Sequence, residues 1–384
     1  MPDQYTSTST TGFGSRIGSS ISGALLGILL FLGSFGLLFW NEGRVDVSLI
    51  AKNAMQIDAT AQNTSAEGKL VAASGTVTTD APIGDDMFLQ PGKYLQVKRT
   101  AEMYAWTEEK DEKTTKNTGG SETTETTYTY KKEWTDTPDK SSEFQHPEGH
   151  ENPSPSIEND TITANAMHVG NYTLQASSLE LPTGDKISLT SSNTTVTSST
   201  GAVIANQQYI FVGSTSTSSL SSPQIGDLRV SYVGVPADKQ LVVFGQLQGT
   251  SIQPFVAKGE TLYRAFVGTK DTAVADLHGE YTLLSWILRA VGFMMMWIGL
   301  SLVLEPISTL LDILPIAGSL GRGLSMGIAF IVSLVLSVIT IVVSMILHSI
   351  IAIILAVAIA ITAGVLFMKN RKKSLATPTP PATT

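Results

Sequence analysis

The sequence predicts an α+β membrane protein with four transmembrane α-helices, one N-terminal and three C-terminal, and a large β-rich extracytoplasmic domain inserted after the first helix. Three observations predict this fold class. Long segments without a charged residue lie near both ends of the 384-residue chain. Residues 41–281, between them, are acidic, with 30 Asp and Glu against 18 Lys and Arg. Several stretches of this middle segment alternate with the two-residue period of β-strands.

The first transmembrane helix is predicted at residues 17–40, after an N-terminal tail of residues 1–16. These 24 residues carry no charge, and as a helix they would extend about 36 Å, enough for a hydrocarbon core of roughly 30 Å. A cleaved signal peptide is the alternative, but its apolar run would have only about 7 to 15 residues. The run ends in Phe39-Trp40 followed by charges, which is typical of a helix that leaves the lipid.

Two further helices are predicted at residues 323–347 and 349–368. The whole segment from 323 to 368 has 46 residues without Asp, Glu, Lys or Arg. As one helix it would be about 69 Å long, more than twice what a single crossing needs. We therefore expect a turn at Leu347-His348-Ser349, where the only titratable side chain interrupts the run.

The remaining helix is predicted at residues 282–304. It contains Arg289, which lies close enough to the polar end of the helix to extend to the membrane interface. Residues 305–322 then form a connector to the next helix. Four crossings place both termini on one side of the membrane.

Basic residues predict which side this is. Arg16 precedes the first helix, and the tail of residues 369–384 begins with Lys369, Arg371, Lys372 and Lys373. The positive-inside rule places both termini and the connector in the cytoplasm, and the domain of residues 41–281 outside. The membrane would be the plasma (inner) membrane of a prokaryote, or the endoplasmic reticulum and inner nuclear membrane of a eukaryote. An acidic domain argues against nucleic acid as a partner.

The extracytoplasmic domain is predicted to be rich in strands. Alternation and β-branched or aromatic residues predict strands at 94–101 and 126–134, joined by a polar hairpin tip at 107–124. A second hairpin is predicted from 227–235 and 240–248, with turn-forming residues between them. Additional strands are expected at residues 70–77 and 209–212, and a helix is expected to begin at Asp271.

Small residues at four-residue spacing predict close packing between helices. These residues are Gly23, Gly27, Gly323, Gly327, Ala352, Ala356, Ala360 and Gly364. The partner helix can belong to the same chain or to another copy, and the sequence leaves both possibilities open.

Five titratable side chains fall at or near membrane depth: Arg289, Glu305, Asp312, Arg322 and His348. Such charges are costly in lipid and therefore have a structural or functional reason. We expect them to contact the interface and lipid headgroups, because most lie near predicted helix ends. A pore or proton relay is the alternative, and it would need several of these charges on facing helices within the bilayer.

The sequence offers only a weak candidate metal site. His146 and His150 are four residues apart, with carboxylates nearby, but Pro147 and Gly149 disfavour the helix that this spacing requires. An exposed turn is the preferred interpretation. The chain contains no Cys, which excludes disulfides, thiolate metal sites and a cysteine nucleophile. We expect no catalytic residues and no cofactor.

Several short strings occur in an order that resembles one family. They are Asn41-Glu42-Gly43-Arg44, Glu102-Met103-Tyr104-Ala105-Trp106, Tyr128-Thr129-Tyr130 with Glu133-Trp134, Gly149-His150-Glu151-Asn152-Pro153, Gly226-Asp227-Leu228-Arg229, and Trp286 to Gly292 with Arg289. Together they cover nearly the whole chain, which on these strings is similar to the LUMA (transmembrane protein 43) family of four-helix membrane proteins.

The resemblance implies a large lumenal domain, cytoplasmic termini and self-association. Animal members organise the nuclear envelope and hold partner proteins there, with a suggested link to lipid metabolism, whereas the role of prokaryotic members is unknown. The resemblance carries over no catalytic residues. The leading hypothesis is therefore a non-enzymatic integral membrane scaffold whose partners are the lipid bilayer, further copies of itself and other membrane proteins. The alternatives are an enzyme or carrier in membrane lipid metabolism, using Arg289, Glu305 and Asp312, and an ion-conducting assembly.

Overall fold

The computed structural model describes residues 3–117, 119–196, 201–311, 317–349 and 361–362. The chain divides into two compact units. The β-rich unit is made of Met1–Thr10, Val45–Thr115 and Thr123–Tyr281. The helical unit is made of Thr11–Arg44, Lys116–Glu122 and Thr282–Thr384.

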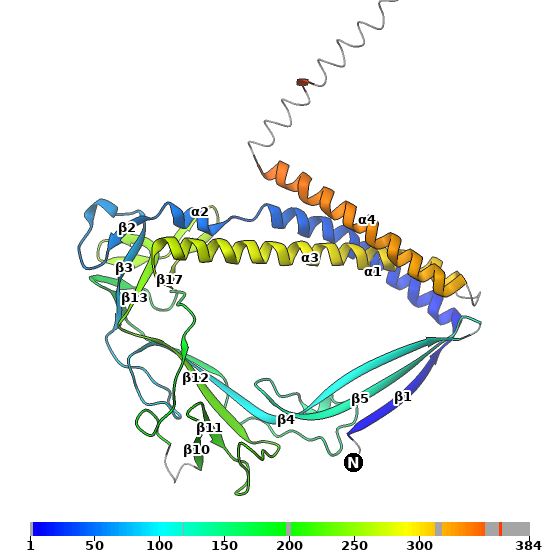
Figure 1. The fold of residues 1–384 in the computed structure, drawn as a ribbon, viewed down its shortest axis with the longest axis horizontal. Coiled ribbons are helices and arrows are strands. Elements are labelled where there is room, and N and C mark those ends of the chain that lie inside the picture. The colour runs from blue at the N-terminus through cyan, green and yellow to red at the C-terminus, as the bar shows by residue number, and fades with distance from the viewer. Residues whose placement is uncertain (1–2, 118, 197–200, 312–316, 350–360, 363–384) are drawn as a thin grey trace, which may run out of the picture. The chain divides into compact units, whose positions relative to one another are not determined.

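The first sheet of the β-rich unit has eight strands among the described residues (Figure 1). Six of them follow the order β1 (Gln4–Thr11), β5 (Glu122–Thr135), β4 (Tyr94–Lys116), β12 (Leu228–Pro236), β11 (Tyr209–Val212) and β10 (Ala202–Ala205). In addition, β6 (Asp160–Thr163) pairs with β4, and β9 (Asp185–Lys186) pairs with β12. The predicted strands at 94–101, 126–134 and 209–212 are confirmed by β4, β5 and β11.

The second sheet has seven strands among the residues described. Their order is β17 (Arg264–Val267), β13 (Lys239–Gln248), β14 (Ser251–Gln253), β8 (Tyr172–Leu174), β7 (Met167–Val169), β3 (Leu70–Thr79) and β2 (Met55–Asp58), and β13 also pairs with β3. A separate ribbon consists of β15 (Phe255–Ala257) and β16 (Glu260–Leu262). The short helices are α2 (Val47–Lys52), η1 (Thr64–Ala66) and η2 (Ser141–Glu143).

The second sheet is buried on both faces, as the alternation along β3 shows. Val71 and Ala73 belong to one apolar cluster, whereas Ala72 belongs to another. The second cluster also contains Ala273 and Leu277 of α3 (Lys270–Leu311), so the first turns of this helix cover that face. The helix expected at Asp271 is thus present, and it begins one residue earlier.

The predicted hairpin of residues 227–248 is wrong, because its two strands belong to different sheets. β12 pairs with β4, whereas β13 pairs with β3. The connecting residues are held by both partners: Ala237 N–H donates to Lys93 O at 2.9 Å, and Asp238 N–H donates to Val77 O at 2.8 Å. Turn-forming residues predict a reversal of the chain, but they do not determine which strands pair afterwards.

The polar tip predicted at residues 107–124 is mostly strand. β4 continues to Lys116 and β5 begins at Glu122. Polar side chains meet across the two strands: Thr107 donates to Glu133 at 3.0 Å, and the hydroxyls of Thr114 and Thr124 lie 3.2 Å apart. Such cross-strand pairs stabilise a sheet without apolar alternation, which explains why the pattern did not reveal these residues as strand.

The N-terminal segment also differs from the expectation. Residues 4–11, expected within a cytoplasmic tail, form β1 and pair with β5. The Tyr130 N–H donates to Asp3 O at 2.8 Å. The side of the membrane on which residues 1–16 lie stays a prediction.

A cysteine pair tests this pairing directly, because the chain has no native Cys. The hydroxyls of Thr10 and Thr123 lie 3.4 Å apart. We expect Thr10→Cys with Thr123→Cys to form a disulfide under mild oxidation, seen as a shift in non-reducing electrophoresis. Ser9→Cys with Thr123→Cys is the control, because successive side chains of a strand point to opposite faces. Equal cross-linking of both pairs, or of neither, would contradict the pairing.

Among the described residues, the helical unit contains three helices that are long and apolar enough to span a membrane. Figure 1 labels all three. They are α1 (Phe13–Glu42), the part of α3 from Thr282 onward, and α4 (Ala317–His348). The helices predicted at 17–40, 282–304 and 323–347 are thereby confirmed as helices, and α4 ends at the predicted turn. The fourth helix, 349–368, and the tail, 369–384, lie almost entirely outside the described residues.

The connector predicted at residues 305–322 is shorter than expected. α3 continues to Leu311, past Pro306, and α4 begins at Ala317. The polar residues Glu305 and Ser308 therefore lie on a helix, where they can face another helix. The position of Asp312 lies outside the described residues.

The predicted small-residue face of α1 packs against α3 of the same chain. A Cβ atom on Gly27 would lie 2.6 Å from Gly299 O, and one on Gly299 would lie 2.7 Å from Gly27 O. The contact at Gly23 is looser: a Cβ atom there would lie 3.6 Å from Glu305 Oε2 and 3.9 Å from the Leu302 side chain. Gly323 and Gly327 have open space instead. The predicted residues Ala352, Ala356, Ala360 and Gly364 lie outside the described part of the chain.

Candidate functional sites of the two units

In the helical unit, a two-pronged ion pair joins Glu42 to Arg289. Arg289 Nε and Nη2 each donate to one carboxylate oxygen of Glu42 at 2.8 Å. The two side chains are 6% and 21% exposed, respectively. This two-pronged geometry is the strongest form of a charge-assisted pair. Arg289 also lies over the ring of Trp286, 4.8 Å from its centre. Arg289 is therefore bound to another helix, whereas the sequence predicted contact with the interface.

The residues on either side of Glu42 complete this cluster. Asn41 is buried, and its amide donates to Ser285 O on α3 at 3.2 Å. Arg44 lies 5.9 Å from the centre of the Trp40 ring. His348 contacts Phe39 with 4.6 Å between ring centres, and Ser344 donates to Phe39 O at 3.1 Å. One cluster thus joins the ends of α1 and α4 to the middle of α3.

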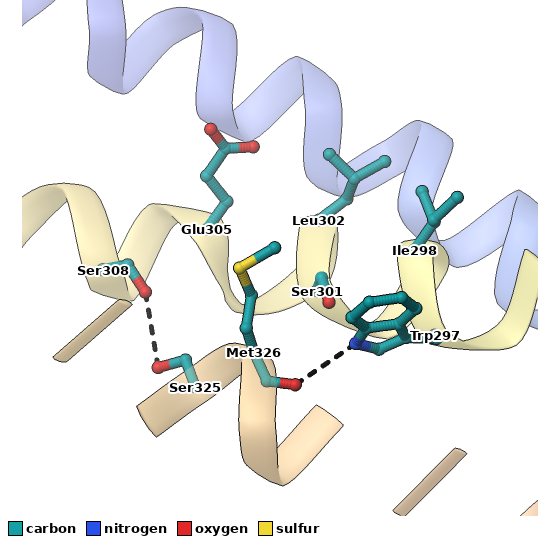
Figure 2. A pocket seen from close by; sticks show the side chains of 8 residues that line it. All are labelled: Trp297, Ile298, Ser301, Leu302, Glu305, Ser308, Ser325 and Met326. Atoms are coloured by element: carbon teal, nitrogen blue, oxygen red, sulfur yellow. Dashed lines mark hydrogen bonds between the residues drawn. The ribbon is translucent and has the colours of Figure 1, made fainter. Parts of the chain in front are cut away.

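A cavity of about 270 Å³ lies between α3 and α4. Figure 2 shows the side chains that line it: Trp297, Ile298, Ser301, Leu302, Glu305, Ser308, Ser325 and Met326. The indole N–H of Trp297 donates to Met326 O at 3.2 Å, and the Ser308 and Ser325 hydroxyls lie 3.4 Å apart. The sequence had predicted Glu305 as an interface contact. Its position in a cavity with three serines was not predicted.

Ser325 also lies in a string with hydrolase-like spacing, Gly323-Leu324-Ser325-Met326-Gly327. In hydrolases this pattern positions a nucleophile at a sharp turn between a strand and a helix. Here the string lies inside α4, and the hydroxyl of Ser325 interacts with Ser308. The local structure is therefore not that of a nucleophile elbow. Arg322, another predicted interface charge, lies in the first turns of α4.

In the β-rich unit, Glu102 and Arg229 form a second two-pronged ion pair. Arg229 Nε and Nη2 donate to the Glu102 carboxylate at 2.7 Å each. The guanidinium also lies 4.8 Å from the ring centres of both Trp134 and Tyr209. Tyr104 contacts Trp134 with 5.3 Å between ring centres. Four neighbouring strands thus present one charged and aromatic face.

Asp227 and its neighbours anchor the loops beside this face. Asp227 is fully buried and accepts hydrogen bonds from Ser214 N–H at 2.6 Å and Gln224 N–H at 2.7 Å. Burial alone would raise the pKa of Asp227, but these hydrogen bonds hold it below its usual range. Gly226 has φ of 91°, and a Cβ there would lie 2.9 Å from the Pro153 ring. Leu228, next in this string, pairs with Met103 in the strand register.

His150 lies within an aromatic cluster, not in a metal site. Its ring stacks on Tyr130 at 3.9 Å between centres and meets the edge of Trp106 at 4.7 Å. Its Nδ1 is 3.0 Å from His146 O. The described residues contain no group of three or more His, Cys, Asp or Glu side chains that could hold a metal ion. The imidazoles of His146 and His150 contact aromatic rings and backbone, and His150 Nε2 also lies 3.7 Å from Asp3 Oδ1.

Asn152 fixes the loop that carries His150 to the sheet. Its side-chain oxygen accepts from Trp106 N–H at 2.7 Å, and its amide donates to Trp106 O at 2.8 Å and to Asp139 O at 3.0 Å. The first two bonds pair the backbone N–H and C=O of Trp106 with the Asn152 side chain. In a sheet, a neighbouring strand would bond these two groups. The residues noted at 149–153 thus serve to attach a loop, a role that no local sequence pattern reveals.

Tyr130 makes the cluster sensitive to alkaline pH. Burial and a hydrogen bond to Glu108 raise the pKa of Tyr130 from 10.0 to about 12. Between pH about 10 and about 12, the unfolded chain releases the Tyr130 proton whereas the folded protein keeps it. Ionisation therefore favours the unfolded chain. The stability that is fully present below pH about 10 is lost as the pH rises toward 12. We expect Tyr130→Phe to reduce this loss in thermal unfolding measured across this range. Tyr128→Phe is the control, and an unchanged alkaline profile in Tyr130→Phe would contradict the assignment.

One buried network was not predicted from the sequence. Asp85 accepts a hydrogen bond from Tyr232 and forms an ion pair with Arg99 at 2.6 Å. Arg99 Nε also donates to Glu158 O at 2.9 Å. Burial and the Asp85 hydrogen bond raise the pKa of Tyr232. The network joins the loop before β4 to β4 and β12, and its satisfied hydrogen bonds indicate a structural role.

Comparison with known proteins gives consistent matches. The family model described as Transmembrane protein 43 matches residues 103–350. Transmembrane protein 43 of Homo sapiens is 29% identical over 354 residues, which cover 82% of this chain and 85% of the relative. The protein of the same name from Rattus norvegicus is 28% identical and covers 82% and 81%. The Drosophila melanogaster homolog is 27% identical and covers 72% and 75%.

No solved structure matches this chain. The family match spans more than half of the chain, from strand β4 to the end of α4. It includes Arg229 with its aromatic neighbours, the His150 loop, and the helix that carries Arg289 and Glu305. The chain therefore belongs to the transmembrane protein 43 family of membrane proteins.

Proposed function

We propose that this protein is a non-enzymatic membrane scaffold. The helical unit lies in the membrane, and the β-rich unit lies outside the cytoplasm and binds other membrane proteins or further copies of the chain. The location is the plasma (inner) membrane if the source is prokaryotic, or the endoplasmic reticulum and inner nuclear membrane if it is eukaryotic.

One observation carries this proposal: residues of the family strings form internal attachments. Glu42 binds Arg289, Asn152 binds the backbone of Trp106, and Asp227 binds the backbone of two loop residues. Polar groups engaged in this way hold helices and loops in place. They are not left open toward a substrate, which favours a binding or organising role over chemistry.

Cross-linking in native membranes tests the proposal. The tagged full-length protein is treated with an amine-reactive cross-linker before solubilisation and is then purified under denaturing conditions. We expect species of two or more copies and covalently attached membrane proteins. A tagged membrane protein of unrelated sequence and equal abundance is the control. Recovery of monomer alone, with the same background proteins as the control, would overturn the scaffold proposal.

A second candidate is a carrier or enzyme acting on membrane lipids, and the Glu305 cavity is the observation that favours it. Replacing Glu305 by glutamine would then change the lipid composition of the membrane without changing the abundance of the protein. Unchanged lipid composition in this variant would remove the support for this candidate.

A further inference from the structure

The cavity between α3 and α4 contains a carboxylate without a partner. Glu305 is half-buried among apolar side chains and three serines, and it has no hydrogen-bond or ion-pair partner within the described ranges of the chain. A carboxylate removed from water is costly unless a cation or several hydrogen-bond donors compensate it. Elsewhere in the same unit, the Glu42 carboxylate has such a cation in Arg289. Glu42 and Glu305 therefore differ in whether the protein itself supplies a counter-charge.

The same cavity contains a hydroxyl without a partner. Ser301 Oγ is buried, and no described residue lies within hydrogen-bond distance of it. Buried polar atoms in proteins are nearly always hydrogen-bonded, so an exception calls for an explanation. Ser301 and Glu305 are four residues apart on α3 and therefore occupy adjacent turns of one face. Because Ser301 Oγ is fully buried, a ligand in the cavity would contact the Glu305 carboxylate and not this oxygen.

The walls indicate the rest of the ligand. Trp297, Leu302 and Met326 supply apolar surface around the polar groups (Figure 2). The outer faces of α3 and α4 are also apolar, with exposed side chains that include Ile298, Ile307 and Leu324. Surfaces of this kind contact lipid hydrocarbon in a membrane helix. The ligand that fits is therefore a lipid, with a cationic donor group at one end.

We propose that this cavity binds the ammonium head group of an aminolipid. An ammonium carries a positive charge and three N–H donors, so it can both neutralise the Glu305 carboxylate and donate to its oxygens. Two other head groups fit less well. A quaternary ammonium carries the positive charge but has no N–H donor, and a neutral alcohol has a donor but no charge. The aminolipid to test is phosphatidylethanolamine. This inference goes beyond the scaffold proposal and does not depend on it.

Lipid retention by the full-length protein tests the proposal. The protein is incorporated into phosphatidylcholine nanodiscs that contain equal small amounts of phosphatidylethanolamine and its N-acetyl derivative with the same chains. The lipids that remain bound after transfer to detergent are measured by mass spectrometry. The two probe lipids differ only in the ammonium group, so their ratio reports recognition of that group.

We expect the native protein to retain phosphatidylethanolamine over the N-acetyl lipid by about tenfold or more, in line with a charged hydrogen bond. Glu305→Gln should abolish this preference, whereas Glu260→Gln, at an exposed position on β16, should keep it. Equal retention of the two probes by the native protein, or an unchanged preference in Glu305→Gln, overturns the proposal.

A second variant and a truncated chain keep the test decisive even if Glu305→Gln fails to fold. Ser301→Leu keeps the carboxylate but fills the cavity, and it should lower retention of phosphatidylethanolamine. The thermal unfolding midpoint of each variant shows whether it has folded.

The chain truncated after Met368 lacks its basic tail. If this truncated chain retains phosphatidylethanolamine and the full chain does not, the tail occupies the cavity, and the proposal is overturned.

Discussion

Replacing Glu42 by glutamine is expected to lower the free energy of unfolding by about 3 to 5 kcal/mol, the cost of breaking one partner of a buried ion pair. The physical reason is that Arg289 would keep its charge in a site with little access to water, with no carboxylate at 2.8 Å. The effect is measured as the shift in the unfolding transition of the detergent-solubilised protein and as abundance in the membrane.

A double variant separates the pair from its surroundings. Glu42→Gln with Arg289→Gln removes both charges, and it should be more stable than Glu42→Gln alone, because no unpaired charge remains. Glu260→Gln, at an exposed position, serves as the control and should change stability by less than about 0.5 kcal/mol. If Glu42→Gln behaves like this control, the pair does not hold α1 to α3.

The second large effect is expected from Gly27→Leu. A side chain at this position would collide with the Gly299 carbonyl oxygen, which lies 2.6 Å from the Cβ position, and with the Cβ atom of Leu302 at 2.8 Å. Because part of this obstacle is backbone, the helices must separate, and we expect a loss of at least about 1 to 3 kcal/mol. The unfolding transition in detergent and the amount of folded protein in the membrane report the loss.

Gly36→Leu is the matched control for this prediction. It places the same side chain on the same helix, but nothing lies within 4 Å of a Cβ atom there. Gly36→Leu should therefore leave stability close to that of the native protein. Equal losses in the two variants would show that helix propensity, not the contact between α1 and α3, controls the result.

The helices were predictable from the sequence because a membrane requires long charge-free segments. The runs at residues 17–40, 282–304 and 323–347 lie within α1, α3 and α4. Strand positions were also predictable where apolar and polar residues alternate, as at the start of β4. Helix ends were less predictable, because Glu305 and Pro306, which suggest a connector, are both compatible with a helix that continues to Leu311.

Pairing between distant segments was not predictable. Glu42 and Arg289 are 247 positions apart, and a single sequence shows only that each is a charge near the end of a helix. A lone arginine in an apolar helix does indicate that a carboxylate lies at a similar depth, and this signal could have suggested Glu42. No such signal shows that β12 and β13 belong to different sheets. A strand with alternating apolar and polar residues can pair with the next strand of the chain or with a distant one, and the alternation is the same in both cases.

The pairing of β1 with β5 also bears on how the orientation of the chain in the membrane is predicted. Arg16, just after β1, forms an ion pair with Glu122 at 3.1 Å, so its charge already has a partner inside the protein. The positive-inside rule counts basic residues as if they were free to stay in the cytoplasm. The orientation predicted from the sequence therefore depends on the basic residues at 369–373 more than on Arg16.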